Sequence, residues 1–175
     1  MDLKQELQQS YSVARNTRLV HDIGRDPIKF AALAAHFFGP QVRISQQAIT
    51  VMSCCADKHP FLVKPYLEKI ILNLQQQPSG PVKRGILRIL QHQDIPRPLQ
   101  ALVADTCFQY LLSQEPPAIK AYALSVIANL ARTEPDLDQE LKLVIGDQWP
   151  YASPAFKSRA GKILEAMKKS AAKTR

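Results

Sequence analysis

A short pattern of apolar and basic positions recurs along the chain. It is clearest in residues 81–90, where a proline is followed by an apolar residue, a base and further apolar positions at helical spacing. Similar stretches begin at Pro117 and Pro154, and a weaker one begins at Pro40. The apolar markers that precede the base lie 40, 37 and 37 positions apart, at Val42, Val82, Ile119 and Phe156. Because helical-repeat proteins have periods of this length, the sequence predicts an α-solenoid.

Prolines divide the predicted repeats into helices. A proline costs about 3 kcal/mol inside a helix, but it is tolerated in the first turn, where its missing N–H would have no partner. The first helices of the pairs are expected to begin near Pro40, Pro81, Pro117 and Pro154. The second helices are expected to begin near Pro60, near Pro96 or Pro98, and near Pro135. Continuous β-branched runs bounded by turns are missing, which argues against strands.

The expected fold is one all-α domain over residues 1–175, a right-handed superhelix of about four helix pairs behind an N-terminal helical cap. The cap spans 1–26, with Ser12 capping a helix that ends at Gly24, and Asp26 caps the next helix. The approximate pairs span 27–58, 59–95, 96–134 and 135–170, and 171–175 is expected to be a basic tail.

Each first helix carries a stripe that is expected to be buried. Positions 0, 4, 7 and 11 from the marker project to nearly the same side of a helix. The stripes begin at Val42, Val82, Ile119 and Phe156, and they become more apolar toward the C-terminal repeats. Trp149 is expected to belong to the apolar side of the last second helix.

Three first helices open in the same way, with an apolar residue, a base and a small apolar residue three positions after the base. The three openings are Val82-Lys83 with Ile86, Ile119-Lys120 with Ala123, and Phe156-Lys157 with Ala160, whereas Val42-Arg43 is followed by Gln46. This opening resembles that of the second helix of the HEAT repeat of the armadillo superfamily, over roughly residues 27–170. The resemblance implies a helical-repeat fold whose first helices, as counted here, line an inner, concave face.

The most regular polar feature is the base that follows each marker. It falls about 100° from the marker, at the flank of the buried stripe, where its stem can cover apolar neighbours and its head can meet carbonyls or acids. The alternative is a row of cations on the concave face that binds an acidic protein segment. The predicted binding residues are Arg43, Lys83, Arg84, Arg88, Lys120, Lys157 and Lys162.

The net charge of +8 falls in blocks along the chain. Residues 157–175 hold seven bases and one acid, and residues 43–97 hold eight bases and three acids. Residues 105–147, in contrast, hold three bases and seven acids. An acidic partner suits the two basic blocks, although lysines at a chain end commonly serve solubility alone.

Two other function classes stay open. A basic concave strip could follow a nucleic-acid backbone, as in HEAT-like alkylpurine DNA glycosylases, for which Trp149 and Tyr122 are the aromatic candidates. The other class is a lyase-associated HEAT protein, although the serine-rich, methionine-containing loop of adenylosuccinate lyase is absent. The four histidines are scattered, and no phosphate loop, metal-ligand set or nucleophile motif is present. The sequence therefore favours a non-catalytic scaffold without metal or cofactor.

The cysteines bear on the compartment. Cys54, Cys55 and Cys107 form no C-x-x-C pair, and buried reduced thiols are expected, which favours a cytoplasmic protein. The polar N-terminus lacks the apolar segment of a signal peptide, and no apolar run is long enough for a membrane span. The sequence identifies neither the partner nor the oligomeric state.

Overall fold

A computed structural model describes residues 2–173 of the chain, and these residues form helices and no β-strand. The α-helices are α1 (Leu3–Gln8), α2 (Val13–Ile23), α3 (Pro27–Phe37), α4 (Val42–Lys58), α5 (Leu67–Asn73), α6 (Gly80–Leu90), α7 (Arg97–Leu112), α8 (Pro117–Leu130), α9 (Pro135–Gln148) and α10 (Pro154–Lys173). Three 3-10 helices are η1 (Pro60–Tyr66), η2 (Leu74–Gln76) and η3 (Trp149–Tyr151). The predicted all-α class is confirmed.

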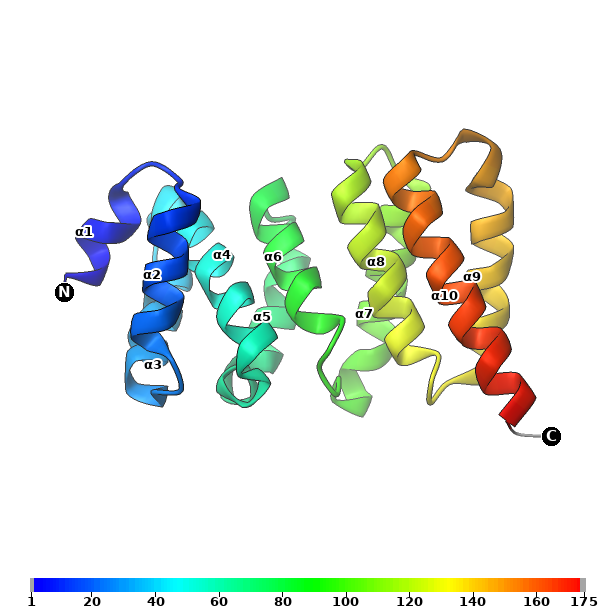
Figure 1. Cartoon of the computed structure of the whole chain (residues 1–175), viewed down its shortest axis with the longest axis horizontal. Helices are drawn as coiled ribbons and strands as arrows, with labels where there is room; N and C mark the ends of the chain where they lie inside the picture. Colours follow the sequence, from blue (N-terminus) through cyan, green and yellow to red (C-terminus); the bar gives the residue numbers. More distant parts are fainter. Residues whose placement is uncertain (1, 174–175) are drawn as a thin grey trace. The chain divides into compact units, whose positions relative to one another are not determined.

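The helices form two compact units, unit 1 (Met1–Gln93) and unit 2 (Asp94–Arg175). Unit 1 holds α1 to α6, and unit 2 holds α7 to α10 (Figure 1). The predicted cap, the first predicted pair and residues 59–93 of the second pair thus lie in unit 1, and the last two predicted pairs lie in unit 2. A single domain over the whole chain stays a prediction.

Prolines mark the helix starts as predicted. Helices α8, α9 and α10 each begin at the expected proline, and α4, α6 and α7 begin within two residues of one. The predicted caps also form, because Asp26 Oδ1 accepts from the backbone N–H groups of Ile28 (2.8 Å) and Lys29 (3.2 Å). Gly24 ends α2 with a φ of 51° and a ψ of −122°, a positive-φ conformation that glycine adopts more readily than other residues. These local signals fixed the boundaries because they act within one turn of the helix.

The element after Pro60 differs from the expected α-helix. It begins as the 3-10 helix η1, and α5 starts only at Leu67. Pro65 lies inside η1 and lacks the N–H that an α-helix would donate to the carbonyl of Phe61. The second proline therefore delays the α-helix.

In unit 1, α4 lies between α3 and α6 and packs against both (Figure 1). Its predicted stripe is buried at Ile49 and Ser53, but Val42 is 69 % exposed, which corrects the expectation for that residue. Because α4 has neighbours on two sides, its first turn is anchored instead by Ile44, which is buried on a different side of the helix.

A buried arginine attaches the N-terminal cap to α4. The Arg15 guanidinium donates to the carbonyls of Gln9 and Ser10, both at 2.7 Å, and to Oε1 of Gln47 on α4 at 2.7 Å. Pattern reasoning from the sequence missed this contact, because an arginine on the apolar side of a helix follows no repeat of the chain. The cap is therefore held by polar bonds as well as by apolar packing.

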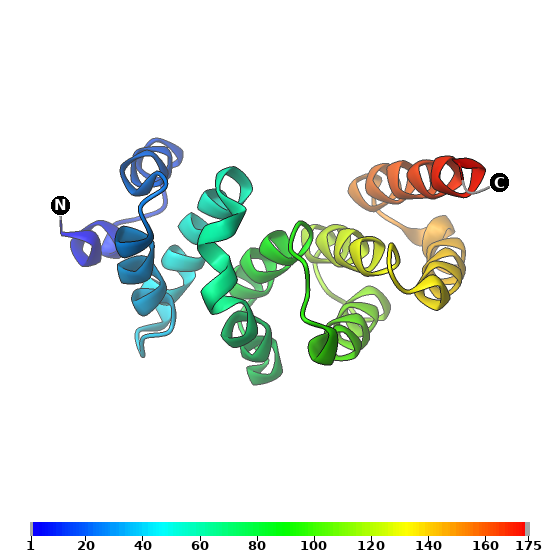
Figure 2. The same ribbon diagram turned by 90° about the horizontal axis from the view of Figure 1, so that it is seen from below.

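In unit 2, α8 packs against α7, α9 and α10, and Figures 1 and 2 show α8 and α10 as neighbours. The predicted stripe of α8 is buried throughout, at Ile119, Ala123, Val126 and Leu130. The stripe of α10 is buried only at Phe156 and Ala160, whereas Ile163 and Met167 are half-buried. The expected sharpening toward the C-terminus thus fails in α10, whose main packing partner is α8 alone.

Two further expectations concern the end of the chain. Trp149 is 40 % exposed and so does not belong to the core. Helix α10 continues to Lys173, so the predicted tail is helical in its first part, and residues 174 and 175 lie outside the described residues. No helix within residues 2–173 combines the length and the apolar character that a membrane crossing needs.

Candidate protein-binding surfaces

The first candidate surface lies on α4 and α6 of unit 1. Arg43, Thr50 and Asp57 are seven positions apart, so they lie on one side of α4, and none of them is buried. Arg84 and Arg88 are four apart on α6, and the Arg88 guanidinium bonds to Asp57, which brings these two helix sides together. We call the surface formed by Arg43, Asp57, Arg84 and Arg88 the α4–α6 face.

One of its three cations is balanced within the face. Both Nε (3.0 Å) and Nη2 (2.5 Å) of Arg88 donate to Oδ2 of Asp57, and each side chain is 33 % exposed. Arg43 and Arg84 are exposed, and within the described part of the chain no ion pair joins either of them to an acid. The face therefore offers two uncompensated guanidinium groups next to an internal ion pair.

The other predicted binding residue of unit 1, Lys83, is half-buried on α6 and projects about 100° away from Arg84. In unit 2, Lys120 on α8 and Lys157 on α10 are also half-buried, whereas Lys162 is exposed. The structure thus divides the seven predicted residues, four in unit 1 and three in unit 2. Their use as one binding surface stays a prediction.

The two units differ in charge. Unit 1 holds twelve bases and six acids, a net charge of +6, and unit 2 holds eleven bases and nine acids, a net charge of +2. Most of the excess charge thus belongs to the unit that carries the α4–α6 face. The net charge of unit 1 therefore attracts negatively charged molecules more strongly than that of unit 2.

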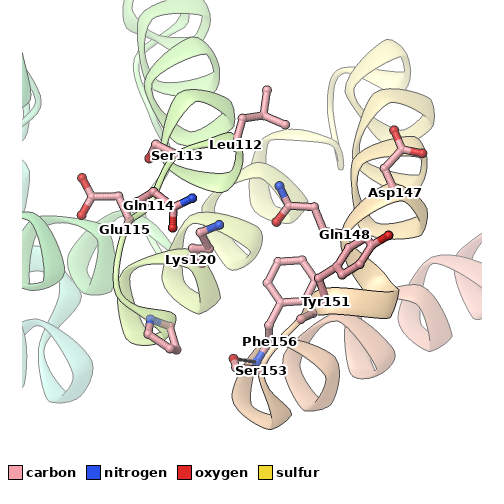
Figure 3. A pocket seen from close by; sticks show the side chains of 12 residues that line it. Leu112, Ser113, Gln114, Glu115, Lys120, Asp147, Gln148, Tyr151, Ser153 and Phe156 are labelled. Carbon is pink, nitrogen blue, oxygen red and sulfur yellow. Dashed lines mark hydrogen bonds between the residues drawn. The ribbon is translucent and has the colours of Figure 1, made fainter.

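The second candidate is a pocket of about 440 Å³ in unit 2 (Figure 3). Its lining comes from the end of α7, the start of α8, the end of α9, η3 and the start of α10. Apolar contact surface is supplied by Leu112, Tyr151 and Phe156, and polar groups are supplied by Lys120 and Gln148, among others. We call it the unit 2 pocket.

The polar side of the unit 2 pocket is partly fixed by hydrogen bonds. Gln148 Nε2 donates to the carbonyl of Leu111 (2.5 Å), which orients the amide, and Ser153 Oγ accepts from the backbone N–H of Phe156 (3.2 Å). Lys120 is the only cation among the lining residues, and Figure 3 shows it between the carboxylates of Glu115 and Asp147 at opposite edges. Sequence reasoning found Lys120 but missed the pocket, because its lining is spread over five elements.

Two of the three cysteines, Cys55 and Cys107, are buried thiols with a raised pKa. Burial, with a smaller contribution from Cys54, raises the pKa of the Cys55 thiol to about 12, and burial alone raises the pKa of Cys107 well above its usual range. Both thiols are therefore protonated at neutral pH and are poor nucleophiles. Within the described residues, no group of three or more His, Cys, Asp or Glu side chains could hold a metal ion.

Paired helices whose first members recur at a regular spacing and bury part of the same stripe define a helical-repeat protein. Residues 3–167 match the family described as HEAT repeat domain, and the chain belongs to this family. The resemblance seen in the repeat openings is thereby confirmed. Searches among curated proteins and among solved structures gave no match. A HEAT repeat chain is a helical scaffold capable of protein interaction.

Proposed function

We propose that the protein is a non-catalytic interaction scaffold whose α4–α6 face binds an acidic protein segment. The observation that carries this proposal is the exposure of Arg43 and Arg84 on neighbouring helices with no acid of the described chain paired to them. Guanidinium groups bind carboxylates through two parallel hydrogen bonds, so two exposed arginines can hold two acidic side chains of one segment.

The Arg88 and Asp57 pair has a different part in this proposal. Because Arg88 already bonds to Asp57, it contributes little free charge, and it joins α4 to α6 so that Arg43 and Arg84 keep their relative positions. The net charge of +6 on unit 1 increases the rate of encounter with an acidic partner. Lys83, Lys120, Lys157 and Lys162 stay predicted contacts of the same partner or of its flanking residues.

The test uses a fluorescein-labelled peptide of repeated Glu-Ser-Leu units and the full-length protein, with binding followed by fluorescence anisotropy. Changing Arg43→Glu and Arg84→Glu together is expected to weaken binding by about tenfold or more, because two attractive contacts become repulsive. The matched control is Lys4→Glu with Lys64→Glu, which makes the same charge change at two exposed lysines on α1 and η1. An equal loss in the control would show attraction by net charge alone, and the α4–α6 face would not be the binding surface.

Nucleic-acid binding is the competing outcome of the same assay. A labelled DNA duplex titrated at about 50 mM and 200 mM salt reports how many phosphates are neutralised, because counterion release makes the affinity fall steeply with salt. We expect the duplex to bind more weakly than the peptide at the higher salt concentration. Tighter duplex binding that the Arg43→Glu and Arg84→Glu changes abolish would overturn the proposal in favour of a nucleic-acid surface.

A further inference from the structure

We propose that the unit 2 pocket binds the C-terminal carboxylate of a partner chain that ends in an apolar residue. This inference goes beyond the proposed function, because it concerns another unit, a pocket that is not part of the α4–α6 face, and another ligand chemistry. Its basis is the combination of a cavity, exposed apolar side chains at its mouth and a single half-buried cation within it.

The size and the walls of the pocket suit one or two amino-acid residues. Its volume of about 440 Å³ lies within the range of pockets that bind small ligands. Leu112 is 67 % exposed and Tyr151 is 91 % exposed, whereas the ring of Phe156, which also lines the pocket, is buried. An apolar side chain between Leu112 and Tyr151 would remove apolar surface from water at both residues, which favours binding.

The Lys120 ammonium group of the pocket favours a carboxylate at the end of the ligand chain. Lys120 is half-buried, and within the described residues its ammonium group has no hydrogen bond or ion pair to another side chain. A carboxylate beside Lys120 would form a charge-assisted hydrogen bond in a partly desolvated site. Because Gln148 uses its Nε2 on the carbonyl of Leu111, its Oε1 can accept the backbone N–H of the same terminal residue.

The acids at the edges limit how much negative charge can enter. Glu115 and Asp147 both line the pocket, and Figure 3 shows their carboxylates on opposite sides of Lys120. A run of acidic residues would meet repulsion from both edges, whereas one carboxylate next to Lys120 with an apolar remainder would not. A cationic side chain would also be repelled, because it would have to lie near the Lys120 ammonium group. The arrangement therefore fits a chain end and not an acidic run.

The experiment maps binding of two small probes by chemical shifts of the ¹⁵N-labelled full-length protein. N-acetyl-leucine reproduces the end of a chain, and N-acetyl-leucinamide differs only in lacking the negative charge. We expect the acid to shift the backbone signals of Lys120, Gln148 and Phe156 and to bind about tenfold more tightly than the amide. Equal affinity of the two probes, or shifts confined to residues outside the pocket, would overturn the proposal.

Two variants separate the two halves of the recognition. Lys120→Met keeps the aliphatic stem and is expected to weaken binding of the acid about tenfold while leaving binding of the amide unchanged. Lys168→Met, at an exposed lysine on α10, is the matched control that should affect neither. Leu112→Ser is expected to weaken the binding of both probes. Because Leu112 is exposed, this change should not unfold the protein, so a loss of binding would not be caused by misfolding. Unchanged binding of the acid to the Lys120→Met variant would contradict the proposal.

The Arg43→Glu and Arg84→Glu variant should bind N-acetyl-leucine normally. Loss of peptide binding by the α4–α6 face and loss of probe binding by the unit 2 pocket can thus be told apart.

Discussion

Two interfaces between first helices can be compared, that of α4 with α6 in unit 1 and that of α8 with α10 in unit 2. They differ at one position of the repeat, which has no side chain in the first interface and a long polar side chain in the second. This position lies three residues after the marker and holds Gly85 in α6 and Arg159 in α10. A Cβ atom added to Gly85 would lie 2.7 Å from Cγ1 of Ile49 on α4, so the helices meet there with no room for a side chain.

In unit 2 the same position carries a long polar side chain. The Arg159 guanidinium lies over the ring of Tyr122 on α8, at 5.7 Å from its centroid, and Nη1 donates to Oγ of Ser125 at 2.9 Å. At this position, neighbouring first helices are thus in direct apolar contact in unit 1, whereas in unit 2 a cation lies over an aromatic ring. The two interfaces differ at one position of the repeat, although each also buries part of the apolar stripe.

The largest expected difference between the two interfaces is in the free energy of unfolding that is lost when an isoleucine of the buried stripe is changed to alanine. Ile89 in α6 and Ile163 in α10 occupy the same repeat position, but Ile89 is 1 % exposed and Ile163 is half-buried. Ile89→Ala should cost about 2 to 5 kcal/mol of the free energy of unfolding, because it leaves a cavity in a packed site. Ile163→Ala should cost about 1 kcal/mol, because water can fill part of the space that the side chain leaves.

Urea unfolding followed by circular dichroism measures both costs. The fluorescence of Trp149, which is the only tryptophan and lies in unit 2, reports that unit separately. Similar costs for the two alanine variants would mean that the half-exposed face of α10 is covered in solution, and the contrast between the interfaces would be lost.

The close contact at Gly85 comes next in size. Gly85→Ala should destabilise the protein by about 1 to 3 kcal/mol, because the new methyl group meets the buried Ile49 side chain and lies 3.3 Å from its backbone oxygen. Gly161→Ala is the matched control in α10, since nothing lies within 4 Å of its Cβ position. There the gain in helix propensity should stabilise by about 0.5 to 1 kcal/mol.

Opposite signs in thermal unfolding would confirm the contrast between the two glycines. A stabilised Gly85→Ala variant would show that α4 and α6 separate at little cost, and the close approach would then not be what holds unit 1 together.

These contacts also show where inference from the sequence ends. The helix starts and the caps were predictable, because a proline or an aspartate acts on the backbone within the same turn. The burial of Val82, Ile86 and Ile89 was predictable from their period, which is a property of one helix.

Contacts between helices could not be predicted in the same way. The pairing of Arg88 with Asp57 depends on how far α6 is shifted along α4, and no periodic pattern within one helix specifies that shift. The exposure of Val42 depends on which sides of α4 its neighbours cover. Lys120 was predicted as a binding residue, but the pocket around it brings together side chains from residues 112 to 156. A cation shortly after a break between two helices, here residues 113–116, is the signal that could have pointed to it.

The smallest expected effect tests the polar junction of unit 2. Arg159→Met keeps much of the length of the side chain but removes its charge and its hydrogen bond to Ser125, and it should cost about 1 kcal/mol. The part that comes from the ring is measured by a double-mutant cycle with Tyr122→Leu. If the guanidinium is attracted to the ring, Arg159→Met should cost about 0.5 kcal/mol less in the Tyr122→Leu background than in the natural chain. Equal costs in both backgrounds would show that the Tyr122 ring does not hold Arg159, and α8 and α10 would then be joined by the hydrogen bonding of Arg159 and not by an aromatic platform.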